Sequence, residues 1–229
     1  MLFPRISILI GLFFSATSAI AESPKVLIST THGDMVIELA EDRAPVTVDN
    51  FLQYVDDGFY DGTIFHRVIE GFMIQGGGFT QDFSRKPTRA AIPNEANNGL
   101  RNHRYTISMA RTNAPHSATA QFFINSEDNR NLDHTSPTPR GWGYAVFGEV
   151  IQGQDIVDKI SQVPTGRGGP FSRDTPREQV VIKSAKLIVA EQPTAQLDTQ
   201  SAVTTNGNAS TIEVLPVACL LYTSDAADD

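Results

Sequence analysis

The chain has 229 residues, a formal net charge of −8 from 18 basic and 26 acidic side chains, and a single cysteine. The acidic balance argues against a general nucleic-acid or anionic-membrane binder, because such proteins need clustered Lys and Arg to neutralise phosphates. One cysteine excludes an internal disulfide framework and a zinc site built from several thiolates. Hydrophobic residues make up 40%, and the 17 glycines raise the apolar fraction into the range of ordinary globular proteins, so a sizeable core is expected.

Residues 1–21 are typical of a secretory signal peptide. Arg5 supplies the positive charge, residues 6–14 form a short apolar run, and small residues end in an Ala19-Ile20-Ala21 cleavage site. The apolar run falls well short of the roughly 20 residues that a membrane-spanning helix needs. We therefore expect cleavage before Glu22, export, and no membrane span in the mature protein.

Residues 22–190 contain short β-rich runs separated by turn residues, which predicts one mainly β domain. Two runs flanking His32-Gly33 predict an opening hairpin. Regularly spaced short strands favour a closed antiparallel barrel, because closure removes exposed sheet edges. The eight expected strands are residues 25–31, 34–40, 63–69, 72–76, 105–110, 121–125, 144–150 and 179–189.

Two α-helices are expected between these strands. Pro45 suits the first turn of one helix, which should continue through apolar residues at helical spacing and end at Gly58. The other helix spans about residues 154–162 and places its apolar side chains on one face. We expect both helices to cap the barrel rather than to carry chemistry.

The C-terminal residues differ in composition from the body. Residues 191–218 are rich in Thr, Ser, Gln, Asn and Ala, which predicts a disordered tail. Residues 219–229, which contain the only cysteine, resemble a translated transposon-end sequencing adapter. We interpret this last segment as an assembly artefact, so the expected mature protein contains no cysteine.

The chain lacks the common sequence patterns of covalent and metal catalysis. Its 5 histidines never occur at the i,i+4 spacing of a zinc-binding helix, and the sequence has no nucleophile elbow, Walker loop or dinucleotide-binding glycine motif. Gly76-Gly77-Gly78 lacks the lysine and helix of a phosphate loop, so a sharp turn or bulge is expected there. The sequence therefore predicts no metal site and no cofactor.

An arginine in an apolar strand is the most informative local feature. Within FHRVIEGFMIQGG, residues 65–77, alternation gives Arg67 apolar neighbours on its face, and a cation there needs a partner or the edge of a cleft. The alternative is an arginine that merely extends from a barrel wall into water. Alternation also places Met73 and Gln75 on one face, and only a turn or bulge would bring Phe72 to the same cleft.

With SMAR at residues 108–111, QFFIN at 121–125 and GYAVFG at 143–148, this stretch resembles the signature blocks of cyclophilin-type peptidyl-prolyl cis-trans isomerases. The ordered resemblance covers about residues 25–189 and, together with the leader, is greatest to periplasmic cyclophilins of Gram-negative bacteria. It implies an eight-stranded barrel capped by two helices, in agreement with the expected elements. It also implies non-covalent stabilisation of a twisted X-Pro amide, whose rotation barrier is about 18–20 kcal/mol.

The resemblance implies a catalytic role for two residues. Arg67 would contact the lone pair that develops on the proline nitrogen as the amide twists, and Gln75 would orient Arg67 or hold the substrate carbonyl region. The other implied substrate-binding residues are Phe72, Met73, Phe123 and Leu132 in the prolyl pocket, Ala110, Arg111 and Gln121 along the peptide groove, and Tyr144 near the pocket. The expected partners are proline-containing segments of unfolded or partly folded proteins in the periplasm, bound by a monomer.

Two positions depart from many eukaryotic relatives, because Asn131 stands where they have Trp and Tyr144 where they have His. Both departures weaken the expectation of tight cyclosporin binding, although Trp142 could supply an aromatic donor if its loop folds inward. Two other functions stay open from sequence. One is a noncatalytic peptide-binding or chaperone module that uses the same groove. The other is a carbohydrate-binding β barrel, for which Trp142 is the sole tryptophan.

Overall fold

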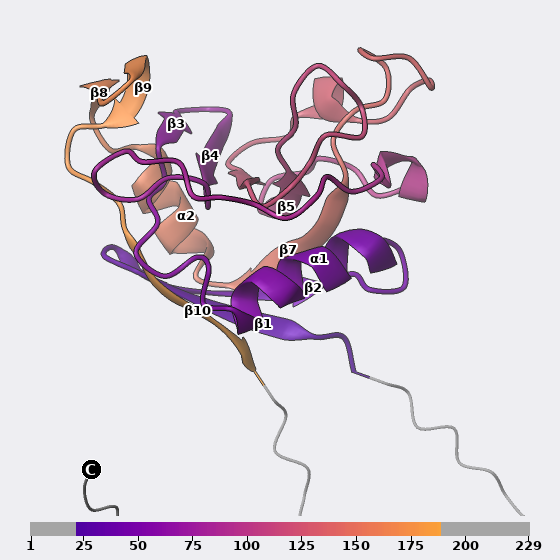
Figure 1. Ribbon diagram of the computed structural model, residues 1–229, viewed down its shortest axis with the longest axis horizontal. Coiled ribbons are helices and arrows are strands. Elements are labelled where there is room, and N and C mark those ends of the chain that lie inside the picture. Colours follow the sequence, from indigo (N-terminus) through magenta and orange to yellow (C-terminus); the bar gives the residue numbers. More distant parts are fainter. Residues whose placement is uncertain (1–21, 189–229) are drawn as a thin grey trace, which may run out of the picture. The chain divides into compact units, whose positions relative to one another are not determined.

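The computed structural model describes residues 22–188 as a body built on an antiparallel sheet (Figure 1). The predicted leader, tail and adapter-like segment lie outside these residues. The strands are β1 (Lys25–Thr30), β2 (Gly33–Leu39), β3 (Arg67–Ile69), β4 (Met73–Gly76), β5 (Thr106–Met109), β6 (Phe122–Asn125), β7 (Val146–Gln152), β8 (Thr165–Gly168), β9 (Phe171–Pro176) and β10 (Ile182–Ile188). The helices are α1 (Pro45–Asp56), α2 (Gln154–Ser161) and the 3₁₀ helices η1 (Ala96–Asn98) and η2 (Arg130–Leu132).

The main sheet contains eight strands in the order β10-β1-β2-β7-β5-β6-β4-β3, and all their pairings are antiparallel. Every strand predicted from the sequence is present in it, with ends that differ by a few residues. The remaining strands, β8 and β9, form a separate hairpin that the sequence analysis did not predict. Residues 165–176 are rich in glycine and charge, and they lack the apolar alternation on which the prediction of strands depends.

The sheet does not close into the predicted barrel. Its end strands, β3 and β10, do not pair with each other in the described part of the chain, where an isolated bridge between Ile64 and Val181 joins the segments beside them. The cause is local: residues 63–66 were expected to be strand, but only Thr63 and Ile64 form isolated bridges, and the ladder begins at Arg67. The closed barrel is therefore corrected to a mainly β fold whose sheet is a curled half-barrel.

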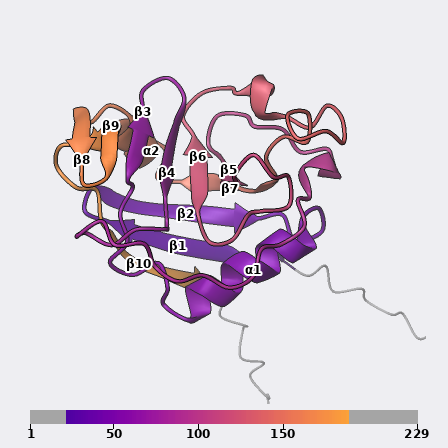
Figure 2. The same ribbon diagram turned by 45° about the horizontal axis from the view of Figure 1, so that its top comes forward.

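The two α-helices lie where the sequence predicts them. α1 starts with Pro45 and packs against β10, whereas α2 packs against β2, β3 and β4 (Figure 2). Proline suits the first helical position, because the N–H group it lacks would have no partner within the helix. Gly153 precedes α2 with a φ of 80°, a left-handed conformation that glycine adopts without strain.

A carboxylate from a distant loop caps α1. The residue before the helix, Ala44, has no side chain that can accept a hydrogen bond. Glu95 instead accepts bonds from the backbone N–H groups of Val46 (3.1 Å) and Thr47 (2.8 Å) and from the Thr47 hydroxyl (2.6 Å). Its negative charge also interacts favourably with the helix dipole. The loop that carries Glu95 is thereby attached to α1.

Aromatic side chains join α1 to the sheet. The Phe51 ring lies 5.2 Å from the rings of Tyr60 and Phe147 and 5.8 Å from that of Phe122, measured between centroids. All four residues are buried. Removing a side chain such as Phe51 from water stabilises the fold by about 1.5–3 kcal/mol. α1 is thus held to the sheet mainly by its apolar face.

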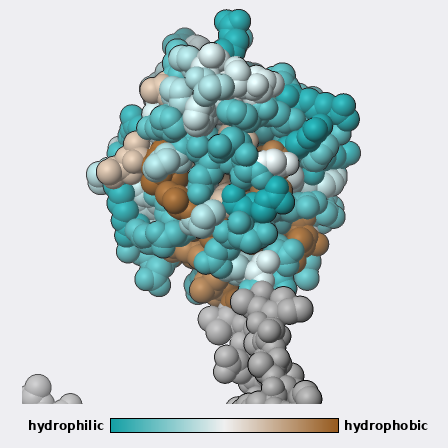
Figure 3. All heavy atoms as spheres, turned by 90° about the vertical axis from the view of Figure 1, so that its right-hand side faces the viewer, coloured by the Kyte–Doolittle hydropathy of each residue, from teal (hydrophilic) through white to brown (hydrophobic). Residues whose placement is uncertain are grey.

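The exterior is mainly hydrophilic on the face drawn in Figure 3, with small hydrophobic areas among the polar side chains. Among residues 22–188, no helix has both the length and the apolar character required to cross a membrane.

Candidate active site

Three neighbouring strands place the predicted catalytic pair beside an aromatic residue. In the register of β3, β4 and β6, Arg67 lies opposite Gln75, and Gln75 lies opposite Phe123. Directly opposed residues in antiparallel strands project to the same face of a sheet. Met73 lies opposite Ile69 and, two positions from Gln75, shares this face. The predicted alternation is therefore confirmed.

Phe72 reaches this region through a turn. It precedes β4, and its backbone N–H donates to the carbonyl of Ile69 at 3.1 Å. Gly71, next to it, has a φ of 67°, which favours glycine. Simple alternation would place Phe72 on the face opposite to Met73, so the turn is what brings the two side chains together.

The side chains around these strands line a cavity of about 110 Å³. Met73 and Phe123 provide buried apolar walls, with 2% and 4% of their surfaces exposed. The Arg67 side chain is 43% exposed, so its charge is not removed from water. The lining residues are Arg67, Phe72, Met73, Gln75, Ala110, Arg111, Phe123, Leu132 and Tyr144. Of the site residues predicted from sequence, Gln121 alone is not in the lining.

Gln121 is joined to the cavity by a chain of hydrogen bonds. Gln75 accepts a bond from Arg67 Nη1 at its Oε1 (3.4 Å) and donates from its Nε2 to Gln121 Oε1 (3.1 Å). The second bond fixes which end of the Gln75 amide faces the arginine. Gly78 leaves room for this arrangement, since a Cβ there would lie 2.4 Å from Gln121 Cγ. Gly77 has a φ of 77°, so the turn predicted for the glycine run is confirmed.

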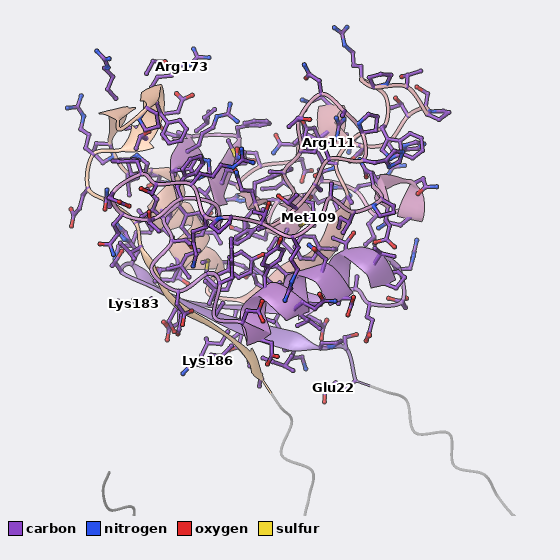
Figure 4. The ribbon with its side chains drawn as sticks, viewed as in Figure 1. Glu22, Met109, Arg111, Arg173, Lys183 and Lys186 are labelled. Carbon is purple, nitrogen blue, oxygen red and sulfur yellow. The ribbon has the colours of Figure 1, made fainter. Side chains whose placement is uncertain are left out.

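The opposite wall of the cavity is held by Arg111. Its guanidinium donates to the backbone carbonyls of Thr112 (2.9 Å), Pro139 (3.2 Å) and Gly143 (2.7 Å), and its Cζ lies 4.6 Å from the centre of the Tyr144 ring. Met109 lies inside the body at the end of β5, whereas Arg111 lies in the loop region (Figure 4). The Arg111 side chain therefore fixes the loop that carries Tyr144. The Tyr144 ring in turn packs edge-on against Phe123 at 5.6 Å.

A buried asparagine network supports the cavity, and the sequence analysis missed it. Asn129 donates from Nδ2 to the carbonyl of Phe72 (2.8 Å) and to Asn125 Oδ1 (2.7 Å), and Asn125 donates to Thr106 Oγ1 (2.9 Å). Buried amides are stable only when their polar groups are paired, as they are here. No local pattern identifies Asn129 as part of the site, because the residue that it joins to the cavity, Phe72, is distant in sequence.

Trp142 does not supply the aromatic donor considered for the pocket. Its indole N–H donates to the carbonyl of Asn94 at 3.2 Å, and its ring packs edge-on between His116 (4.8 Å) and His134 (5.3 Å). Trp142 is not among the residues that line the cavity. The idea that it replaces the rim tryptophan of eukaryotic relatives is therefore not supported.

A larger cleft of about 680 Å³ lies between α1 and β10. Its lining includes Asp49, Asp56, Asp61 and Lys186, and it has no arginine. Size alone does not identify a site. The smaller cavity combines buried apolar walls with a positioned cation, and for that reason we assign the candidate active site to it.

The family model for cyclophilin-type peptidyl-prolyl cis-trans isomerases matches residues 25–187 of this chain. A peptidyl-prolyl cis-trans isomerase of Streptomyces antibioticus is 62% identical over 163 residues, which cover 71% of this chain and 98% of the relative. The chain belongs to the cyclophilin-type peptidyl-prolyl cis-trans isomerases. Isomerase B of Escherichia coli is 58% identical over 162 residues, with 71% and 98% of the two chains covered.

Solved structures agree with this assignment. A cyclophilin-type isomerase of Cryptosporidium parvum, solved in the presence of the dipeptide Ala-Pro, matches with a TM-score of 0.58 at 26% identity. The match covers 72% of this chain and 99% of that one. The resemblance stated from the sequence is thus confirmed, and this cyclophilin is a peptidyl-prolyl cis-trans isomerase.

Proposed function

We propose that this cyclophilin binds the proline ring of its substrate in the 110 Å³ cavity and uses Arg67 as its catalytic residue. The supporting observation is the position of Arg67, which lines the cavity together with the apolar side chains of Met73 and Phe123. Proline-containing segments of unfolded or partly folded proteins are the substrates, and the Cryptosporidium parvum structure solved with Ala-Pro supports this substrate class.

Rotation about an X-Pro bond requires no covalent step. As the amide twists, conjugation is lost and a lone pair develops on the proline nitrogen. A donor that contacts this nitrogen only in the twisted state lowers the barrier, because it binds the transition state better than either planar isomer. The guanidinium of Arg67 suits this role, since it is always charged and is directed by Gln75.

The surrounding residues hold the substrate in register with Arg67. Phe72, Met73, Phe123 and Leu132 accept the proline ring through apolar contact. Backbone groups at Ala110 and Arg111 pair with the extended peptide, while Gln121 holds Gln75 in place. Tyr144 completes the wall of the cavity.

Arg67→Ala tests the catalytic role directly. We expect turnover of a proline-containing peptide to fall about 10²–10³-fold, as when a single donor to a transition state is removed. Peptide affinity, measured by calorimetry, should change far less. Arg89→Ala is a matched control, because Arg89 is similarly exposed and pairs with Asp57, which does not line the cavity. Equal turnover in wild type and Arg67→Ala would contradict the proposal.

We further propose that residues 1–21 direct export and that the mature enzyme is a periplasmic monomer. The sequence pattern of a charged start, an apolar run and an Ala-x-Ala site supports the leader. Mass spectrometry of protein from a periplasmic fraction should find Glu22 at the N-terminus, and light scattering should give the mass of one chain. Retention of Met1 in that protein would disprove cleavage.

A further inference from the structure

The β8–β9 hairpin lies beside β3, the strand that carries Arg67 (Figures 1 and 2). Phe171 of β9 packs against the buried ring of His66 (5.3 Å) and the partly buried ring of Phe79 (5.1 Å), measured between ring centroids. Within the hairpin, Thr175 is buried and packs closely on Gly168, where a Cβ would lie 2.4 Å from Thr175 Cγ2. The hairpin is therefore held together by packing between its two strands, and β9 joins it to β3 and to the adjacent aromatic residues.

Asp174 on β9 faces the guanidinium of Arg67. Its Oδ2 lies 3.9 Å from Arg67 Nε, while Arg67 Nη1 donates to Gln75 Oε1 at 3.4 Å. The guanidinium is planar, so partners on two of its nitrogens restrict both its position and its orientation. Within residues 22–188, Nη2 has no hydrogen-bond partner, and it stays available to a substrate.

The backbone at Asp174 is held in an unusual conformation. Its φ of 63° makes it one of three described residues other than glycine in the left-handed region, with Phe83 and Tyr105. Aspartate tolerates this region better than most residues, yet the conformation persists only where the surrounding structure imposes it. Phe171 and Thr175 of the same strand are both packed against neighbouring residues, and the Asp174 carboxylate between them lies 3.9 Å from Arg67 on β3.

We propose that Asp174 is a positioning residue for Arg67, and this inference rests on the catalytic role proposed for Arg67. Gln75 holds the guanidinium from β4, and Asp174 holds it from β9. The unpaired Nη2 is then directed to the proline nitrogen without a search among rotamers in each turnover. Ordering the donor in advance lowers the entropy cost of reaching the twisted state.

Arg173 competes weakly for the same carboxylate. Its Nε lies 3.5 Å from Asp174 Oδ2, but its side chain is 82% exposed and points outward from the hairpin (Figure 4). A pair with so mobile a partner is strongly screened by water and salt. Asp174 is only 25% exposed, so its position is set by the hairpin and not by Arg173.

Two substitutions remove the carboxylate and keep the backbone conformation. Asn at position 174 preserves shape and tolerates a positive φ, and Gly removes the side chain without strain. We expect Asp174→Asn and Asp174→Gly each to lower kcat about two- to fivefold, the effect of a partly exposed charge pair, with KM nearly unchanged. Asp57→Asn, which breaks the pair with Arg89, is the matched control and should leave kcat unchanged.

If Asp174 acts through Arg67, two further results are expected that would not follow if Asp174 only stabilised the fold. With an uncharged proline peptide, kcat of the wild type should fall as salt is raised from low to about 1 M, because salt screens the pair, and kcat of Asp174→Asn should not. The residual isomerisation rate of Arg67→Ala can be measured by NMR exchange at high enzyme concentration. Adding Asp174→Asn to this variant should not lower that rate further.

The outcomes separate this inference from the proposed function. Full activity in Arg67→Ala would overturn both. A large loss in Arg67→Ala with unchanged kcat in both position-174 variants would overturn the positioning role alone. Equal fold losses from Asp174→Asn with and without Arg67 would show that Asp174 acts on the fold and not on the arginine, and would overturn it as well.

Discussion

A cation in the wall of an apolar cavity needs partners that fix its position and still leave it free to contact a substrate. Arg67 has two such partners within the described residues, the amide of Gln75 and the carboxylate of Asp174, and each comes from a different strand. Neither contact is short, and the side chain stays partly exposed. This arrangement avoids the large desolvation penalty of a buried charge while limiting the directions in which the guanidinium can point.

Next to Arg67, His66 has the opposite environment. Its side chain is buried among Phe79 and Phe171, and its Nδ1 has no hydrogen-bond partner in the described residues. Burial, aided by the positive charge of Arg67, lowers the pKa of His66 from its ordinary value of 6.5 to about 4. The folded protein therefore keeps this imidazole neutral in mildly acidic solution.

Acid should weaken the fold through this residue. Because the unfolded chain binds the His66 proton more readily, the free energy of unfolding should fall as pH drops from about 6.5 to about 4 and then level off. The full effect is about 3 kcal/mol. Urea unfolding at several pH values should show a smaller loss across this range for His66→Phe than for the wild type. Parallel curves for the two proteins would contradict the expectation.

At the scale of elements, the cap on α1 is the clearest long-range dependence. Glu95 bonds the first turn of α1 from a loop about fifty positions away in sequence. We expect Glu95→Ala to lower the free energy of unfolding by about 1–2 kcal/mol, as loss of a helix cap does. Glu41→Ala removes an exposed carboxylate near the same helix and serves as the control. A change no larger than that of the control, measured by urea unfolding, would rule out this cap as a stabilising contact.

The elements differ in how far the sequence alone could predict them. Strands such as β1 and β2 alternate apolar and polar residues, and α1 carries Pro45 at its start, so local patterns were enough to predict these elements. β8 and β9 have no such pattern. Their hairpin is joined to the body by contacts of Phe171 with His66 and Phe79, which lie in distant segments, and no local rule reports those partners. Full closure of the sheet was predicted from the sequence for the same reason, because the contacts between its two ends are also not visible in local patterns.

The candidate site divides in the same way. Arg67, Gln75, Phe123 and the other cavity-lining residues were identified by their motif blocks, which local sequence carries. Asn129 and Asp174 were not, because the contact that ties each of them to the site is with a residue more than fifty positions away. The residues that line the cavity were therefore predictable, and those that hold the lining in place were not.

At the scale of the whole body, the curled sheet covers part of each end strand without closing. The outer edge of β10 receives backbone hydrogen bonds from residues 62–63, with Gly62 N–H donating to Ile182 (2.8 Å) and Ile182 N–H donating to Thr63 (2.8 Å). At the other end, β9 packs beside β3. These contacts protect the start of β10 and the neighbourhood of β3, and a protected edge does not recruit strands from other chains.

Removal of β10 should destabilise the fold more than the length of this strand suggests. β10 pairs with β1 along its whole length and also packs on α1. We expect a chain that ends at Val181 to lack cooperative unfolding, because β1 and the apolar face of α1 would both be exposed. A chain that ends at Ala190 should unfold like the full chain. Circular dichroism during urea titration checks both, and a cooperative transition in the shorter chain would contradict the expectation.

The pairing of β1 with β10 also bears on the order of events during folding. Lys25 lies opposite Ile188, so β1, the first of the described strands to emerge from the ribosome, waits for β10, the last of them. Contacts between such distant residues carry a high closure entropy and slow the folding of a domain. Until the final strand is free, β1 can pair only with β2, and the hairpin they form is marginally stable by itself. This isomerase is thus itself unable to complete its main sheet before residues 182–188 have been synthesised.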